Sequence, residues 1–201
     1  MDHFERVEVI SLAELRSWLK GNHERSEAVW LVTHKKSQGE LHVPYSDVVD
    51  ELLCWGWVDS TPRKLDDQRS MLLIANRKRK SRWSKVNKDK VARLLSEGRM
   101  QPAGLAKVEL AKSSGTWDAL NEVDLLVEPD DLAASLENVG NAMANWQAFP
   151  PSTRRGILEW ILSAKSPETR ARRIAQTASQ AAENIRANQP RQLKGTKSAV
   201  E

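Results

Sequence analysis

The sequence predicts an α+β protein, with a small mixed β-sheet and packed helices in its N-terminal half and a helical C-terminal half. Three observations carry this prediction. Residues 28–33 form a continuous apolar, β-branched run, which is typical of a strand buried on both faces. Residues 57–60 and 71–74 are strand-like segments on either side of a turn-rich stretch, and from Ser84 onward the apolar patterns have helical spacing.

The N-terminal half alternates strand and helix patterns. Residues 7–10 predict a first short strand. Ser11 and Glu14 then have the spacing of a capping box, which predicts a helix from residue 12. A second helix is predicted between Pro44 and Gly56, because five side chains recur at helical spacing, namely Tyr45, Val48, Val49, Leu52 and Leu53.

The remaining elements are a hairpin and a series of helices. Residues 57–60 and 71–74 predict an antiparallel hairpin. Helices are expected to begin at positions that offer a side-chain cap or a proline suited to a first helical turn, namely Ser84, Pro102, Pro129, Ser152 and Ser166. We therefore expect a mixed α/β sheet region at residues 1–83, a helical region at 84–188 packed on it as one compact unit, and a polar flexible tail at 189–201.

The formal net charge of +4 conceals four alternating blocks. The charge balance is −4 over residues 1–75, +9 over 76–112, −7 over 113–150 and +6 over 151–201. Opposed blocks can dock on each other as well as on a partner. The basic block is therefore weak evidence for nucleic-acid binding.

Several classes of protein are excluded by composition. No apolar run approaches the roughly 20 residues of a membrane helix, and the polar N-terminal segment does not resemble a signal peptide. We therefore expect a cytoplasmic protein without membrane insertion. The single cysteine, Cys54, excludes an internal disulfide, and the histidines lack metal-ligand spacing, so we expect no metal and no cofactor.

Three of the eight tryptophans lie at predicted element boundaries beside polar residues. Trp55 and Trp57 flank a glycine, and Asp59 and Ser60 follow on the next predicted strand. The two indoles are candidate walls of a ligand pocket whose polar floor is Asp59 and Ser60. The alternative assigns both indoles to the core and binds Asp59 to local backbone or to an arginine.

A basic segment precedes the third tryptophan. Free N–H groups at a helix start, together with cationic side chains, can hold a phosphate or carboxylate, which makes Arg82, Trp83, Ser84 and Asn87 candidate ligand-binding residues. Alternatively, the segment grips a nucleic-acid backbone while Trp83 stacks on a base. The residues for that alternative are Arg77, Lys78, Arg79, Lys80 and Lys85. A third interpretation is a solvated basic loop that pairs with the acidic block.

Several short stretches resemble, in order and with plausible spacing, the YdeI/OmpD-associated family, also labelled bacteriocin-protection proteins. The resemblance covers about residues 10–180. The stretches that carry it are Val29-Trp30-Leu31, Lys35-Lys36, Pro44-Tyr45-Ser46, residues 53–60, Ser81-Arg82-Trp83-Ser84 with Asn87, Gly98-Arg99-Met100 with Pro102-Ala103-Gly104, Arg154-Arg155, Trp160-Ile161, Ala164-Lys165, Glu168-Thr169-Arg170 and Arg173-Ile174.

The resemblance implies a role in envelope stress or antimicrobial-peptide resistance and supplies no catalytic residue. We expect a cytoplasmic, non-catalytic binding protein of this type, with a cleft for an unknown small molecule or anion, and we leave a protein partner open. The residues expected to converge on that cleft are Trp55, Trp57, Asp59, Trp83, Ser84 and Asn87. Nucleic-acid binding by residues 77–93 is the alternative. The third hypothesis is an enzyme with an unrecognised site. It ranks last because the sequence shows no P-loop, dinucleotide or nucleophile motif.

Overall fold

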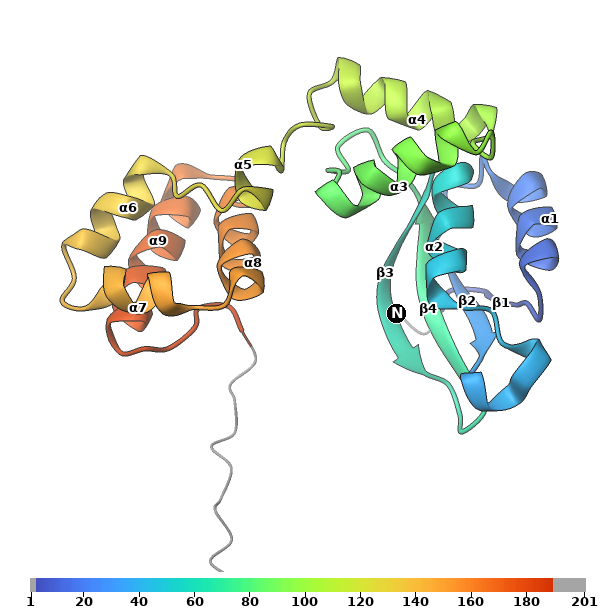
Figure 1. The fold of residues 1–201 in the computed structure, drawn as a ribbon, viewed down its shortest axis with the longest axis horizontal. Helices are drawn as coiled ribbons and strands as arrows, with labels where there is room; N and C mark the ends of the chain where they lie inside the picture. The colour runs from blue at the N-terminus through green and yellow to red at the C-terminus, as the bar shows by residue number, and fades with distance from the viewer. Residues whose placement is uncertain (1–2, 190–201) are drawn as a thin grey trace, which may run out of the picture. The chain divides into compact units, whose positions relative to one another are not determined.

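The computed structural model describes residues 3–189 and divides the chain into two compact units, residues 1–120 and 121–201. The first unit combines a four-stranded sheet with helices, and the described part of the second is helical (Figure 1). The predicted α+β fold class is therefore confirmed. The boundary between the units follows Leu120, whereas the sequence analysis expected one compact unit whose sheet region ends at Trp83 and whose helical region begins at Ser84.

The sheet has the strand order β1-β2-β4-β3. Its strands are β1 (Arg6–Glu8), β2 (Val29–His34), β3 (Trp57–Lys64) and β4 (Arg69–Asn76). Strand β1 is parallel to β2, and the other two pairings are antiparallel, so the sheet is mixed and the predicted hairpin is present as β3–β4. Leu31 pairs with Leu72 and Thr33 with Ser70 across β2 and β4.

Five helical segments accompany the sheet in the first unit: α1 (Leu12–Asn22), the 3-10 segment η1 (Lys36–Leu41), α2 (Tyr45–Cys54), α3 (Lys85–Ser96) and α4 (Pro102–Ser113). Two predicted caps are confirmed. Ser11 Oγ accepts a hydrogen bond from the backbone N–H of Glu14 at 3.2 Å, and Ser84 Oγ accepts one from that of Asn87 at 3.4 Å.

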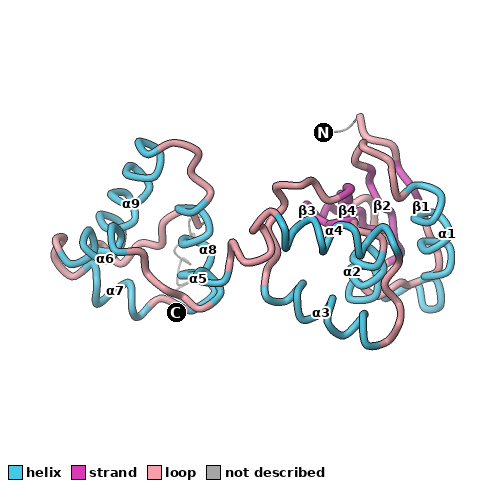
Figure 2. The backbone as a smooth tube through the Cα atoms, turned by 90° about the horizontal axis from the view of Figure 1, so that it is seen from above, coloured by secondary structure: helices cyan, strands magenta, loops and turns pink. Residues whose placement is uncertain are grey.

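The core of the first unit lies between one face of the sheet and helices α1 to α4. Buried apolar side chains from all of these elements form one cluster, among them Leu15, Leu31, Leu52, Leu72, Leu94 and Val108. Figure 2 shows α2 and α3 on the same side of the strands. Helices α3 and α4 contribute to the same core as the sheet, so the first unit includes these two helices of the predicted helical region. Packing of the later helices on the sheet region stays a prediction.

The described part of the second unit consists of α5 (Asn121–Asp124), α6 (Asp130–Glu137), α7 (Ala142–Ala148), α8 (Pro151–Leu162) and α9 (Pro167–Ala182). Helix α9 contacts α6, α7 and α8. Ser166 caps α9 as predicted, whereas Ser152 lies inside α8, because Pro151 already occupies its first position. Of the predicted tail at 189–201, residues 190–201 lie outside the described residues.

No helix within residues 3–189 combines the length and the apolar character that crossing a membrane requires.

Candidate functional site

A cavity of about 520 Å³ lies between the sheet and the start of α2. Leu31 and Leu72, paired across β2 and β4, contribute apolar surface from the sheet, and Val43 and Val48 contribute it from the other side. Thr33, Ser70, Ser60 and several charged side chains complete the lining. A concave, mainly apolar surface with a few polar groups is the usual form of a small-molecule site. We call it the Tyr45–Asp59 cavity.

The cavity takes its name from a hydrogen-bonded pair. Tyr45, the first residue of α2, donates from its hydroxyl to Asp59 Oδ2 on β3 at 2.6 Å. The register of β3 against β4 shifts between Asp59 and Pro62, a bulge that interrupts the regular alternation of side chains. Ser60, within this bulge, donates to the carbonyl oxygen of Leu73 at 3.2 Å. Asp59 and Ser60 were singled out by the sequence and both line the cavity, while their role in ligand binding stays a prediction.

Tyr45 is the only tyrosine in the chain, so its hydroxyl can be titrated without interference from another phenol. Tyr45 is 61% exposed, but desolvation of its hydroxyl beside β3 and the hydrogen bond to Asp59 raise the pKa of Tyr45 to about 12. We expect tyrosinate absorbance to appear with a midpoint near pH 12. The Asp59→Asn variant is expected to titrate at lower pH, because it lacks the carboxylate charge that opposes ionisation.

The matched control for this titration is Asp47→Asn, since Asp47 lies in the same helical turn but accepts its hydrogen bond from Ser46. Circular dichroism over the same pH range establishes that the fold persists. Equal midpoints in the wild-type protein and the Asp59→Asn variant would contradict the Tyr45–Asp59 contact.

Two histidines also line the cavity. His42 Nδ1 lies 2.7 Å from the carbonyl oxygen of His34, and this contact holds the loop before α2 against β2. His34 Nε2 lies 3.1 Å from Glu8 Oε1, whereas His34 Nδ1 is buried and has no hydrogen-bond partner within residues 3–189. A buried polar atom without a hydrogen bond lowers the stability of the folded protein, so a ligand that bonds to His34 Nδ1 would stabilise the complex.

The three singled-out tryptophans lie in the core. Trp57 is fully buried and meets the ring of Trp18 edge-on at 5.4 Å between centroids. Trp55 is buried and donates from Nε1 to Glu51 Oε1 at 3.2 Å. Trp83 is only 1% exposed. Their place at element boundaries therefore reflects packing between elements, and none of these three indoles lines the Tyr45–Asp59 cavity.

The basic segment divides into buried and exposed residues. Arg77 is buried, and its guanidinium carbon lies 3.7 Å from the ring centroid of Trp83, so Trp83 cannot stack on a base in this conformation. Lys78, Arg79 and Lys80 are exposed. Of the other candidates, Lys85 is exposed and pairs with Asp89, Arg82 accepts from Arg77 at its carbonyl oxygen, and Ser84 and Asn87 form the cap of α3. Trp83 and Arg77 line a small cavity separate from that of Asp59.

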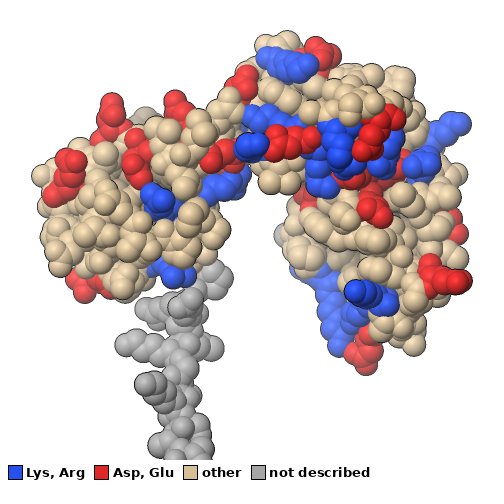
Figure 3. Space-filling model, in the orientation of Figure 1, with Lys and Arg blue, Asp and Glu red and all other residues tan. Residues whose placement is uncertain are grey.

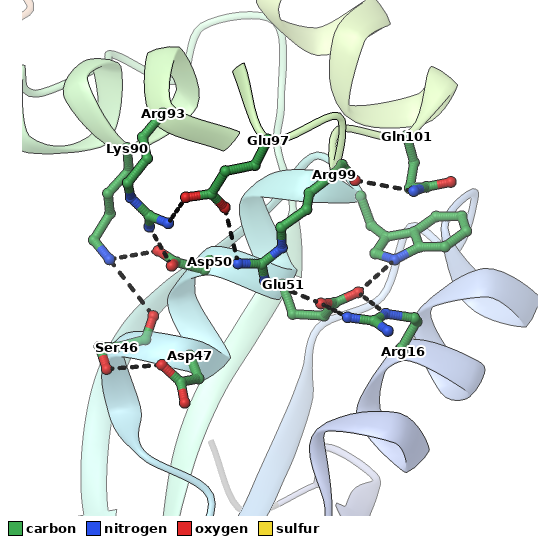
Figure 4. Close-up of polar contacts among 11 residues, drawn as sticks. Arg16, Ser46, Asp47, Asp50, Glu51, Lys90, Arg93, Glu97, Arg99 and Gln101 are labelled. Carbon is green, nitrogen blue, oxygen red and sulfur yellow. Dashed lines mark hydrogen bonds and ion pairs between the residues drawn. The ribbon is translucent and has the colours of Figure 1, made fainter. Parts of the chain in front are cut away.

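Helix α2 also carries two adjacent buried carboxylates, which the sequence analysis did not single out. Asp50 accepts hydrogen bonds from Lys90 at 2.5 Å and from Arg93, both on α3 (Figure 4). Burial disfavours the charged form, but the bonds from Lys90 and Arg93 outweigh it and lower the pKa of Asp50. This contribution to stability is therefore present above the unfolded pKa of Asp50 and is lost as the pH falls through its folded pKa.

The second carboxylate, Glu51, joins α2 to α1. It accepts from Arg16 Nε and Nη2 at 2.9 and 3.0 Å, and Arg99 lies 3.7 Å away (Figure 4). Basic and acidic side chains accordingly alternate over α2 and α3 on the surface in Figure 3. The Glu51 carboxylate is thus surrounded by Arg16, Arg99 and the indole N–H of Trp55. Its side chain is only 3% exposed, so it connects the helices and is not accessible to a ligand.

Within residues 3–189, no group of three or more His, Cys, Asp or Glu side chains is arranged to hold a metal ion. Cys54 is fully buried, and burial raises the pKa of its thiol to about 11, with Glu51 adding to the effect. Its thiol is therefore protonated at neutral pH and shielded from solvent.

Two family models match separate segments of the chain, one in each of the two compact units. Residues 7–107, half of the chain, match the family model described as Domain of unknown function (DUF8412). The chain belongs to this family. Residues 126–184 match the model described as Bacteriocin-protection, YdeI or OmpD-Associated, which confirms the resemblance for that segment. No significant match is found among curated proteins or among solved structures. The Tyr45–Asp59 cavity lies within the DUF8412 segment.

Sequence reasoning found Asp59 and missed its partner. Helical spacing places Tyr45 on an apolar helix face, and nothing local relates it to a residue fourteen positions later. The buried Asp50 and Glu51 were missed as well. A signal was available in retrospect: they lie between the apolar pairs of an amphipathic helix, at Val48-Val49 and Leu52-Leu53, where a charged side chain must be paired if the helix is covered on several sides.

Proposed function

We propose that the protein is a non-catalytic binding protein that holds a small, mainly apolar ligand in the Tyr45–Asp59 cavity, and that it acts in a stress response of the bacteriocin-protection type. The match of residues 126–184 to the bacteriocin-protection model supports the second part. The proposal includes a cytoplasmic location, with which the single buried cysteine agrees.

The observation that carries the proposal is an apolar cavity with an acidic hydrogen-bonding group at its edge. The volume of about 520 Å³ falls within the range of small-molecule sites. Asp59 Oδ2 already accepts the Tyr45 hydrogen, which leaves the other carboxylate oxygen to accept from a ligand N–H. Two lysines also line the cavity, and the ammonium group of one of them, Lys35, is bonded to the carbonyl oxygens of Asp66 and Asp67. Recognition by the Asp59 carboxylate therefore predicts a ligand that pairs an apolar body with an amine or amide donor.

Nuclear magnetic resonance titration with benzylamine and with benzoate tests this proposal, because the two probes share an aromatic ring and differ in charge. We expect benzylamine to shift the resonances of cavity residues and to bind at least about tenfold more tightly than benzoate, since a charge-assisted hydrogen bond to Asp59 stabilises the amine only. The Asp59→Asn variant is expected to lose this preference.

The Asp47→Asn variant again serves as the matched control, because Asp47 does not line the cavity. If neither probe shifts resonances from Leu31, Val48 or Leu72 at millimolar concentration, a small-ligand site at this position is refuted. Benzoate binding as tightly as benzylamine would refute the assignment of Asp59 as the recognition group.

Nucleic-acid binding stays the alternative proposal. It is supported by three consecutive exposed cations, Lys78, Arg79 and Lys80. Since Arg77 and Trp83 are buried, this surface would contact phosphates and not stack on bases. Duplex DNA binding that is weakened by the Lys80→Gln variant would support this alternative.

A further inference from the structure

A second cavity, of about 560 Å³, lies in the first unit where three segments meet. The loop after α1 supplies His23 and Glu24, the end of β4 supplies Asn76, Arg77 and Lys78, and the first turns of α4 supply Lys107. We call it the Arg77 cavity. It shares no lining residue with the Tyr45–Asp59 cavity.

Among the described residues, Arg77 is a buried cation without an acidic partner. The residue is 3% exposed, and no carboxylate forms an ion pair with it in the described part of the chain. Its Nη1 donates to the carbonyl oxygen of Arg82 at 3.2 Å, whereas its Nε is buried and has no hydrogen-bond partner within residues 3–189. Burial lowers the pKa of Arg77 to about 10, against the opposing effect of Asp59.

The stacking of Arg77 on Trp83 offsets only part of the free-energy cost of burying the guanidinium charge. A cation–π contact stabilises a desolvated cation by less than burial of an unpaired ion costs. A guanidinium held in this way has N–H donors in a fixed fork, which suits a phosphate or carboxylate group. A bound anion would therefore neutralise the buried charge of the Arg77 guanidinium.

Two lysines add to the positive charge of the cavity. Lys78 follows Arg77 on the chain, and Lys107 is brought close by a tight contact between α4 and the turn after α2. Gly56 adopts a φ of +76° in this turn, and a Cβ atom there would lie 2.6 Å from Lys107 Cγ. The same turn binds the start of the basic segment, because the backbone N–H of Arg77 donates to the Gly56 carbonyl at 2.9 Å.

The opposing charge in the lining is smaller. Arg25 lines the cavity too, but its guanidinium pairs with Glu5 at 2.8 Å. Glu24 is the one carboxylate among the lining residues, and it is exposed. The cations Arg77, Lys78 and Lys107 therefore exceed the acidic charge by two, which matches a dianion better than a singly charged carboxylate.

We propose that the Arg77 cavity binds the phosphate group of a phosphorylated small molecule, with Arg77 at its base and Lys78 and Lys107 at its rim. The volume exceeds what a free phosphate ion needs, so the ligand is expected to carry an organic group beside Glu24 and His23. This site does not depend on the function proposed for the Tyr45–Asp59 cavity.

Isothermal titration at low ionic strength, with inorganic phosphate and with phenyl phosphate as probes, tests the proposal. We expect both to bind the full chain, with phenyl phosphate the tighter, and the Lys107→Gln variant to bind each about tenfold more weakly, which corresponds to about 1.4 kcal/mol. The Lys80→Gln variant removes one equally charged side chain that does not line the cavity, and it is expected to bind as the wild-type protein does.

Three results would overturn the proposal. The first is no binding of either probe beyond that of chloride at matched ionic strength. The second is equal weakening by Lys80→Gln and Lys107→Gln, which would indicate a diffuse basic surface, and duplex DNA binding weakened by Lys80→Gln would then favour the nucleic-acid alternative. The third is loss of phosphate binding in the Asp59→Asn variant, which would place the anion elsewhere.

Discussion

The Glu51→Ala variant is expected to lose about 3 kcal/mol of unfolding free energy, the lower end of the range for breaking a buried ion pair. The substitution leaves the Trp55 Nε1–H buried without an acceptor and removes both hydrogen bonds from Arg16. The Arg16 side chain is 54% exposed, so water can solvate it again, and this holds the loss at the lower end. Urea denaturation measures the change.

Two further variants provide the comparison for the stability of Glu51→Ala. Glu51→Gln keeps an acceptor for Trp55 but loses the charge that pairs with Arg16, so its loss should be intermediate. Asp89→Ala breaks an exposed pair with Lys85, whose side chains are 67% and 63% exposed, and should cost less than about 1 kcal/mol. A Glu51→Ala variant no less stable than Asp89→Ala would show that the carboxylate does not hold α1 to α2.

The Gly104→Ala variant is expected to be destabilised by a similar amount, about 3 kcal/mol, through steric overlap. A Cβ atom at Gly104 would lie 2.2 Å from the Cys54 carbonyl oxygen and 2.8 Å from that of Leu53. Both neighbours are backbone atoms at the end of α2, so no side-chain rotation relieves the overlap. Helix α4 would have to move away from α2, and the hydrogen bond from Gln101 N–H to Cys54 would be lost.

Gly21→Ala is the matched control, since Gly21 also lies in a helix, but a Cβ atom there would meet no other atom within 4 Å. Alanine is the better helix former by about 1 kcal/mol in a helix interior, so this variant should be at least as stable as the wild-type protein. Thermal and urea unfolding of both variants provide the comparison. A Gly104→Ala variant as stable as Gly21→Ala would contradict the close approach of α4 to α2.

The sequence predicted the local elements well, because their signals act over a few residues. Ser11 and Ser84 bond to N–H groups three residues away, and the 3.6-residue spacing of apolar side chains identifies α2 from its own residues. The β3–β4 hairpin follows from two strand-like runs and the turn between them.

The candidate site was predicted less completely, because its contacts join distant parts of the chain. Trp57 and Trp83 border polar residues in the sequence, and both are buried, since burial depends on what other elements place over a side chain. Asp59 was found as a polar residue in an unusual context, whereas its partner Tyr45 arrives from the start of α2.

Taken alone, the sequence determined the secondary structure, the α+β class and the segregation of charge, because capping, periodicity and composition are properties of short segments. The tertiary structure decided which charges meet and which, among the described residues, are left without an acidic partner. Arg16 and Glu51 are 35 residues apart, and Asp50 and Arg93 are 43 apart, so their pairing depends on how α1, α2 and α3 pack. The same packing buries Arg77 against Trp83, which a basic run in a sequence does not reveal.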